Sequence, residues 1–267
     1  MNTLILSGFG TNCERETAYA CNRAGAPQGS VHVRHISEIY CAGLELEDYG
    51  FLVLIGGFLD GDDLGGARAC ANRFRYRSLP QGGTFLERLR AFVDGGRPVL
   101  GICNGFQLLV KLGLLPGEGN GHPQVTVTTN ARGRFEDRWV HLRVDPASPC
   151  VFTRGMEGID LPVRHGEGRV LGESAAVLEA LVERNLVPLR YALPDGTPTD
   201  AYPANPNGSP HGIAALCSPS GTVMGLMPHP EGFNHFTNHP QWARRPHESD
   251  EGEGLRIFRN AYTYLRG

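Results

Sequence analysis

The chain has 267 residues, of which 40% are hydrophobic and 20% charged, and its formal net charge is -3. This composition supports a sizeable buried core and excludes a disordered chain, and the slightly acidic balance excludes a general attraction to nucleic acid. The motifs described below extend from the N-terminal strand to Glu231 without an intervening linker, so we expect one domain over residues 1–267.

Cysteine usage and hydropathy favour a cytoplasmic protein without a resident metal. The seven cysteines are an odd number at irregular spacings, which predicts neither a disulfide framework nor a zinc site. The first seven residues lack the basic segment of a signal peptide. The longest apolar stretch, around residues 51–59, is too short and too rich in glycine to cross a bilayer, so no membrane association is expected.

Apolar runs in the first half of the chain alternate with helical patterns. Strands are predicted at residues 3–7, 31–34, 51–55 and 98–102. Two capping boxes, Thr11 with Glu14 and Thr84 with Glu87, predict helices that end at Gly25 and Gly95. This alternation predicts an α/β fold, with a mostly parallel sheet covered by helices on both faces and an active site at the carboxyl ends of the strands.

The second half of the chain lacks the regular alternation of strands and helices. Residues 125–128 and 139–144 are predicted to be added antiparallel strands, and residues 255–265 a closing helix. Residues 194–212 are rich in proline, glycine and asparagine and are expected to form a loop that is long enough to be functional, with 203–210 as a flexible gate.

A nucleophile elbow carries the strongest chemical signal. Cys103 follows the apolar run 98–100 directly and precedes a helical pattern, and glycines lie two residues before and after it. Glycines at these positions let the chain turn sharply from a strand into a helix and expose the thiol at the first helical turn. There the helix dipole favours the thiolate. An ordinary buried cysteine is the alternative, but the glycines and the polar Asn104 are poor choices for core packing.

A cysteine nucleophile needs a base and a group that orients the base. Residues 222–227 read as a buried strand that ends in Pro228-His229-Pro230-Glu231. The two prolines stiffen this loop, so His229 is the predicted base and Glu231 its orienting partner. The other histidines without such a partner are assigned to the surface or to packing; they are His32, His35, His122, His141, His211, His235, His239 and His247.

A double glycine after the strand 51–55 is the predicted oxyanion hole. Glycine lets the backbone approach a substrate closely, and the candidate donors are the amides of Gly57, Phe58 and Asn104. Together with the elbow and His229, this arrangement predicts acyl transfer through a thioester.

At this point the sequence resembles the class I glutamine amidotransferases, which have a flavodoxin-like three-layer sandwich and a Cys, His, Glu triad. It is more closely similar to the glutaminase component of phosphoribosylformylglycinamidine synthase. The blocks that carry the resemblance span nearly the whole chain: 10–13, 56–58 with 61–62, 101–107, 133–136, 165–169, 202–210 and 227–231. The departures are the acidic and glycine-rich run 59–66 and the tail that Gly232 opens, which extends over 233–247.

The resemblance implies roles for individual residues. Cys103 is then the nucleophile, His229 the base and Glu231 its partner. Gln107 and the backbone of Gly57 and Phe58 would bind L-glutamine. His165 and Gly166 would supply backbone contacts to the amino-acid end of the substrate.

The resemblance also implies partners. No phosphate-binding loop is recognisable, because Gly117-Glu118-Gly119-Asn120-Gly121 lacks the lysine that such a loop requires. ATP and magnesium are therefore expected on a partner synthetase, and a small bridging subunit is expected in the same complex. The cluster from Arg68 to Arg90 could dock a partner or a phosphate, but a solvated charged face is the preferred interpretation.

Two other functions stay open at this stage. A Cys-His-Glu peptidase or deglycase could use a similar elbow, although Gln107 and the subfamily blocks oppose it. A catalytically silent regulatory subunit could keep the fold, although an intact set of Cys103, His229 and Glu231 opposes that reading.

Overall fold

The computed structural model describes residues 1–41, 43–61, 65–117, 123–245 and 249–267. Part of the run 59–66, most of the run 117–121, and His122 and His247 therefore lie outside the described residues. In the described part, no helix is both long and apolar enough to cross a membrane.

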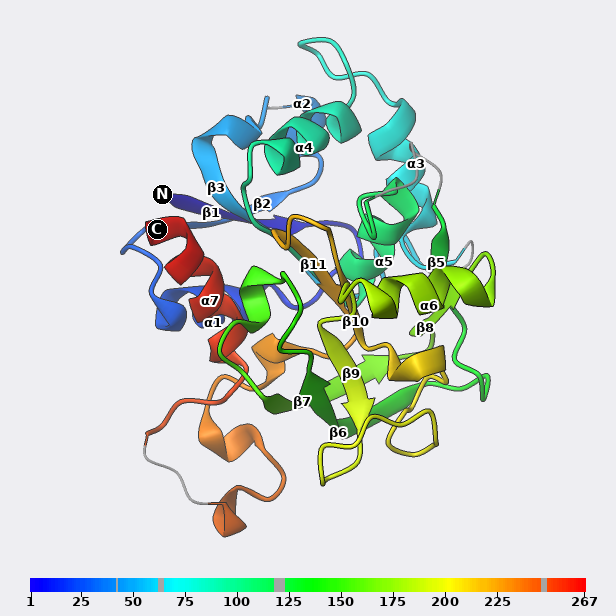
Figure 1. Ribbon diagram of the computed structural model, residues 1–267. Helices are drawn as coiled ribbons and strands as arrows, with labels where there is room; N and C mark the ends of the chain where they lie inside the picture. The colour runs from blue at the N-terminus through cyan, green and yellow to red at the C-terminus, as the bar shows by residue number, and fades with distance from the viewer. Residues whose placement is uncertain (42, 62–64, 118–122, 246–248) are drawn as a thin grey trace.

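A mostly parallel sheet forms the centre of the molecule (Figure 1). Its spatial order is β10-β11-β4-β3-β1-β2, and only β10 runs antiparallel to its neighbour. The strands are β1 (Asn2–Ser7), β2 (Val31–His35), β3 (Tyr49–Leu54), β4 (Val99–Ile102), β10 (Ala215–Cys217) and β11 (Val223–Leu226). Every residue of β3, β4 and β11 is buried, as expected for strands covered on both faces.

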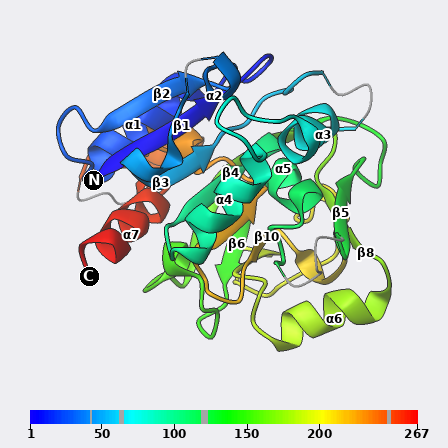
Figure 2. The same cartoon turned by 90° about the horizontal axis from the view of Figure 1, so that it is seen from above.

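Helices cover both faces of this sheet (Figures 1 and 2). On one face α1 packs against α7, and on the other α5 packs against β3, β4 and β11 and contacts α3. The helices are α1 (Glu14–Ala24), α2 (Glu38–Cys41), α3 (Arg68–Tyr76), α4 (Phe85–Asp94), α5 (Asn104–Leu112), α6 (Ala175–Glu183) and α7 (Leu255–Arg266). The predicted α/β architecture is confirmed.

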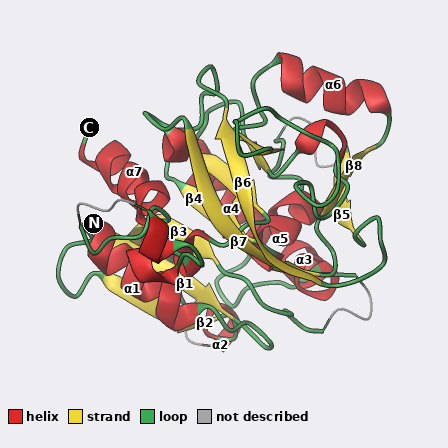
Figure 3. Cartoon of the chain, turned by 90° about the horizontal axis from the view of Figure 1, so that it is seen from below, coloured by secondary structure: helices red, strands yellow, loops and turns green. Residues whose placement is uncertain are grey.

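The predicted antiparallel strands belong to two separate small sheets and are not added to the central one. One sheet pairs β5 with β8, and the other has the order β7-β6-β9. In the view from below, β6 and β7 lie in front of the central sheet, and β5 and β8 lie near α6 (Figure 3). The strands are β5 (Val125–Thr128), β6 (Glu136–Val144), β7 (Gly158–His165), β8 (Arg169–Gly172) and β9 (Leu189–Ala192).

One of the two predicted capping boxes is present. Thr84 accepts from the amide of Glu87, and the Glu87 carboxylate accepts from the amide of Thr84, so α4 begins as predicted. The prediction for Thr11 is wrong because α1 begins at Glu14 itself. The hydroxyl of Thr11 instead donates to the Glu14 side chain and to the carbonyl of Gly8.

Candidate active site

Cys103 lies at a strained turn between β4 and α5. Its φ of 51° and ψ of -101° are unusual for a residue with a side chain, and such strain is commonly found at functional positions. Both flanking glycines are required by packing. A Cβ on Gly105 would lie 2.0 Å from the carbonyl oxygen of Leu54, and one on Gly101 would lie 2.5 Å from Leu109. The predicted elbow is therefore present, with the thiol at the first turn of α5 and 6% exposed.

His229 and Glu231 lie beside this elbow because β11 runs parallel to β4, with Leu226 paired to Ile102. Nδ1 of His229 lies 2.6 Å from Oε1 of Glu231, and both side chains are buried. Burial opposes protonation, but the charge of Glu231 and the contact with Cys103 outweigh it and raise the pKa of His229 well above its ordinary value. The structure thus brings the three predicted triad residues together.

The thiol of Cys103 also lies close to a backbone carbonyl. Its Sγ lies 3.8 Å from the carbonyl oxygen of Arg164, and Nε2 of His229 is buried without a hydrogen-bond partner in the described part of the chain.

The double glycine lies directly against the triad. A Cβ on Gly56 would lie 2.9 Å from Cε1 of His229 and 3.5 Å from Cβ of Cys103. Gly57 has a φ of +139°, and a Cβ there would lie 2.5 Å from Cα of Thr11. At Gly56 a side chain would crowd the triad. At Gly57 a side chain would also be strained by the positive φ, so both positions favour glycine.

The prediction of Phe58 as an oxyanion donor is not supported by this conformation. Its amide already donates to the carbonyl of Gly10 at 2.8 Å, which closes a short bridge between Thr11 and Gly57. The candidate donors that remain are the amides of Gly57 and Asn104. The side chain of Asn104 is buried and accepts from the amide of Leu59 at 2.9 Å.

Gln107 makes its side-chain hydrogen bonds within the protein. Its Oε1 accepts from Nδ2 of Asn104 at 2.6 Å, and its Nε2 donates to the carbonyl of Glu167 at 2.6 Å. The carboxylate of Glu167 in turn accepts from the amide of Gly66 at 2.8 Å. In this structure Gln107 therefore ties α5 to the segment after β7, and it does not present a free amide to a substrate.

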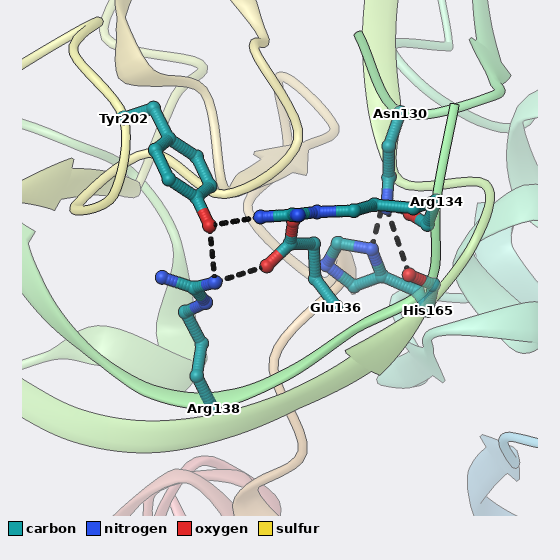
Figure 4. A network of polar contacts seen from close by, with 6 residues as sticks. All are labelled: Asn130, Arg134, Glu136, Arg138, His165 and Tyr202. Carbon is teal, nitrogen blue, oxygen red and sulfur yellow. Dashed lines mark hydrogen bonds and ion pairs between the residues drawn. The ribbon is translucent and has the colours of Figure 1, made fainter. Parts of the chain in front are cut away.

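Asn130 holds the segment at His165 and Gly166 (Figure 4). Its Nδ2 donates to the carbonyl of His165 at 2.8 Å, its Oδ1 lies 3.1 Å from Nδ1 of His165, and its amide donates to the carbonyl of Gly166 at 2.9 Å. Burial and the nearby charge of His229 lower the pKa of His165 to about 4, so its ring is neutral at pH 7. Sequence reasoning missed Asn130, which has no local signal.

A charged network centred on Glu136 lies next to His165. Glu136 pairs with His165 across β6 and β7 and is buried, with its carboxylate bound by Arg134 and Arg138 (Figure 4). Burial alone would raise the pKa of Glu136, but the two arginines lower it. Both arginines also donate to the hydroxyl of Tyr202. The network connects two of the blocks that carry the sequence resemblance, 133–136 and 202–210.

The loop 203–210 is held by its own side chains, contrary to the expectation of a flexible gate. Asn205 donates to the carbonyl of Ser209 at 2.8 Å, and the hydroxyl of Ser209 donates to Oδ1 of Asn207 at 2.7 Å. Asn207 also donates to the carbonyl of Gly168 at 2.7 Å. This loop therefore supports the segment that follows β7.

Cys13 and two further histidines lie beside charged or catalytic side chains. Cys13, in the block 10–13, has its Sγ within 4.8 Å of ligand atoms of His229 and Glu231, and burial raises the pKa of its thiol. His141, which the sequence assigns to the surface or to packing, is partly exposed, and its Nδ1 lies 2.5 Å from Oδ1 of Asp160. Nε2 of His239 lies 3.4 Å from the same carboxylate.

Comparison with known proteins agrees with this fold. A family model described as a CobB/CobQ-like glutamine amidotransferase domain matches residues 1–265, and the chain belongs to this family of glutamine amidotransferases. Within it, the chain is 42% identical to the phosphoribosylformylglycinamidine synthase subunit PurQ of Dehalococcoides mccartyi, over 100% of this chain and 98% of that protein. It is 36% identical to the PurQ subunit of Methanococcus maripaludis strain C7, over 98% and 96% of the two chains.

A solved structure shows the same relationship. The structure of PurLQS from Thermotoga maritima matches with a TM-score of 0.71 and 25% identity, over 99% of this chain and 98% of that one. The chain thus groups with the PurQ subunits in sequence and in fold.

Proposed function

We propose that this chain is the glutaminase subunit of a phosphoribosylformylglycinamidine synthase. It hydrolyses L-glutamine to glutamate and ammonia and delivers the ammonia to a synthetase partner, which converts formylglycinamide ribonucleotide to formylglycinamidine ribonucleotide in purine biosynthesis. The observation that carries the chemistry is the elbow thiol of Cys103 beside the buried pair of His229 and Glu231. The near full-length similarity to PurQ subunits supports the pathway.

The reaction begins with the thiol proton of Cys103 already on Nε2 of His229, because the raised pKa of His229 favours this thiolate–imidazolium pair, and the thiolate attacks the side-chain carbonyl carbon of glutamine. His229 then gives the proton to the leaving nitrogen, which departs as ammonia and leaves a glutamyl thioester on Cys103. Water attacks the thioester with His229 as the base, and glutamate and the free thiol are released. Glu231 accepts from Nδ1 of His229, fixes the ring and stabilises the imidazolium that forms twice in the cycle.

The tetrahedral intermediates carry a negative oxygen that needs donors. We assign these to the backbone amides of Gly57 and Asn104, at the end of β3 and at the first turn of α5. The helix dipole of α5 adds to the stabilisation at the second donor.

Glutamine is bound by the backbone of His165 and Gly166. The side chain of Asn130 holds this segment in place through its hydrogen bonds to His165. Gln107 contributes by holding the same segment through the carbonyl of Glu167. A direct contact between the Gln107 amide and the substrate requires one of its two internal hydrogen bonds to break.

The chain itself is proposed to carry no cofactor. ATP and magnesium act on the synthetase partner, and a small bridging subunit joins the two; the PurLQS label of the matching structure supports an assembly of this kind. We place the complex in the cytoplasm, without nucleic acid or membrane as a partner.

The test compares two nitrogen sources in the assembled synthase. Cys103→Ala is expected to abolish glutamine-driven formation of the amidine and to leave ammonia-driven formation largely intact, because the thiol serves only to release ammonia. The control is Cys41→Ala, which removes an exposed thiol and should change neither rate. An equal fall of both rates in Cys103→Ala would make Cys103 a structural residue.

The same material separates the alternatives. A peptidase or deglycase would act on its own substrates and not release glutamate from glutamine. A silent subunit would leave Cys103 unlabelled by a glutamine-like electrophile in wild type and in Cys41→Ala alike.

A further inference from the structure

Cys13 lies next to the triad without a role in the proposed reaction. It occupies the N-terminal end of α1 and is 8% exposed, and its thiol donates to Oδ1 of the neighbouring Asn12 at 3.3 Å. Its Sγ, a nitrogen of His229 and a carboxylate oxygen of Glu231 all lie within 4.8 Å of one another. A thiol, an imidazole and a carboxylate are the three ligand types that zinc uses in proteins.

The atoms of this cluster are short of partners. Nε2 of His229 and Oε2 of Glu231 are buried and lack hydrogen-bond partners in the described part of the chain, and the two side chains are only 4% and 2% exposed. Oδ1 of the nearby Asn234 is in the same state. Buried lone pairs without partners cost free energy, and a bound cation is one way to satisfy them.

An open path leads to the cluster. A cavity of about 590 Å³ is lined by Cys13, Glu231 and Asn234, and also by Arg15 and Arg164. Neither Cys103 nor His229 is among the residues that line it, so it reaches the cluster from a side other than the elbow thiol. A hydrated metal ion can enter here, and the cavity leaves room for a water molecule on the metal.

We infer that Cys13, His229 and Glu231 form a site for a thiol-seeking divalent cation, with zinc as the probe of choice. Binding releases the thiol proton of Cys13 and the second imidazole proton of His229, and the metal takes the Sγ of Cys13, the freed imidazole nitrogen and one carboxylate oxygen of Glu231, with water from the cavity as the fourth ligand. Bond lengths of about 2.0 to 2.3 Å place ligand atoms roughly 3.3 to 3.8 Å apart around a tetrahedral ion. The separations of up to 4.8 Å between these atoms therefore need to contract by at most about 1.0 to 1.5 Å.

Occupation of the site silences the glutaminase, because the metal holds the imidazole that takes the proton from Cys103. This consequence rests on the proposed function, whereas the binding itself does not. The metal inferred here inhibits the enzyme and is not a cofactor. The expectation that the reaction itself needs no metal on this chain is therefore unchanged. Magnesium, which prefers oxygen ligands, is not expected to compete.

The binding test uses the full chain with Cys103→Ala as the background, so that the nucleophile cannot supply a ligand. Zinc affinity is measured by competition with a chromophoric chelator, and cobalt is added separately to detect the absorption of a thiolate-bound ion. We expect one zinc per chain, and Cys13→Ser in this background should weaken it at least tenfold and abolish the cobalt signal. Cys41→Ser, which changes an exposed thiol, should leave both unchanged.

A second variant guards against misfolding of the first. Glu231→Gln in the Cys103→Ala background should also weaken zinc at least several-fold, because it removes a charged ligand. Zinc affinity that is unchanged by both Cys13→Ser and Glu231→Gln would overturn the site. Failure of the proposed function would give a different result: the wild-type chain would bind zinc, but its complex would show no glutamine-driven activity in the absence of zinc.

The inhibition test uses the assembled synthase with Cys103 intact. Zinc should suppress glutamine-driven turnover, and the concentration for half inhibition should rise at least tenfold in Cys13→Ser when each variant is normalised to its own rate without zinc. Equal sensitivity of the two enzymes would show that zinc acts at Cys103 alone and would overturn the inhibitory role of the site.

Discussion

Replacement of Gly56 by alanine tests the geometry of the triad without removing any of its groups. The added Cβ would lie 2.9 Å from Cε1 of His229, 3.4 Å from Sγ of Cys13 and 3.5 Å from Cβ of Cys103. Gly56 does not have a positive φ, so alanine is compatible with the backbone and the effect is steric. His229 is buried and its amide donates to the carbonyl of Pro162 at 2.8 Å, so the ring cannot retreat freely.

The expected loss in kcat follows from how far the ring of His229 is displaced. Carbon atoms in ordinary contact lie at about 3.5 Å or more, so the ring of His229 must move by roughly 0.5 Å. A misplacement of about 1 Å can cost about 100-fold in rate, so we expect kcat for glutamine to fall by roughly 10- to 100-fold, or about 1.4 to 2.7 kcal/mol.

The assay is glutamine-driven and ammonia-driven turnover of the assembled synthase, and only the first should fall. Gly95→Ala is the matched control, since its Cβ would lie 3.3 Å from the carbonyl of Ala91 at the end of α4. Gly95 precedes the amino end of β4, whereas Cys103 follows its carboxyl end, so this change should leave both rates unchanged. A folded Gly56→Ala enzyme with a glutamine-driven kcat within twofold of wild type would refute the steric reasoning.

Three further predictions follow from the site. Glu231→Gln should reduce glutamine-driven kcat less than His229→Ala does, because Glu231 only orients and charges the base; equal or reversed losses would count against these roles. Burial and the charge of His229 lower the pKa of His165 to about 4, whereas in the unfolded chain it is about 6.5. Between these values only the unfolded state binds the proton, so stability should be lost as the pH falls from about 6.5 to 4, by on the order of 3 kcal/mol. Urea unfolding of wild type and His165→Gln across this range checks it, and identical pH slopes would contradict it. Finally, the isolated chain should hydrolyse glutamine poorly, and the synthetase with its acceptor and ATP should raise kcat by about 10² to 10³, the value of one oxyanion donor; glutamate release at saturating glutamine, with and without partner, measures this, and a free chain as fast as the complex would exclude it.

The central sheet could be predicted because its strands carry uninterrupted apolar runs. The run 98–102 predicts β4 (Val99–Ile102), and the elbow glycines predict the start of α5. In contrast, β7 (Gly158–His165) was not predicted, since Pro162 and Asp160 interrupt its alternation. It forms because β6 offers a long antiparallel partner, and such tertiary pairing can override local propensity.

The triad could be predicted because its members lie in two short motifs, whereas the residues that hold it could not. Asn130 lies 35 residues from His165, and Gln107 lies 60 residues from Glu167. Neither pair has a fixed sequence spacing, and only the folded backbone brings the partners together. The same holds for Cys13, which reaches His229 because α1 and the loop after β11 meet at the same edge of the sheet.

The sequence predicted the position of the oxyanion hole but not which of its amides are free to donate. A double glycine indicates exposed amides but not which of them is free. Here the amide of Phe58 is taken by Gly10, and the amide of Asn12 donates to the carbonyl of Gly56 at 3.3 Å, so the segment 10–12 clamps the turn that presents Gly57. Phe9 and Phe58 are 60% and 48% exposed beside this clamp. A partner that covered these two rings would act on the position of the Gly57 amide without touching Cys103, and the predicted partner-dependent hydrolysis would then have a physical route through the backbone.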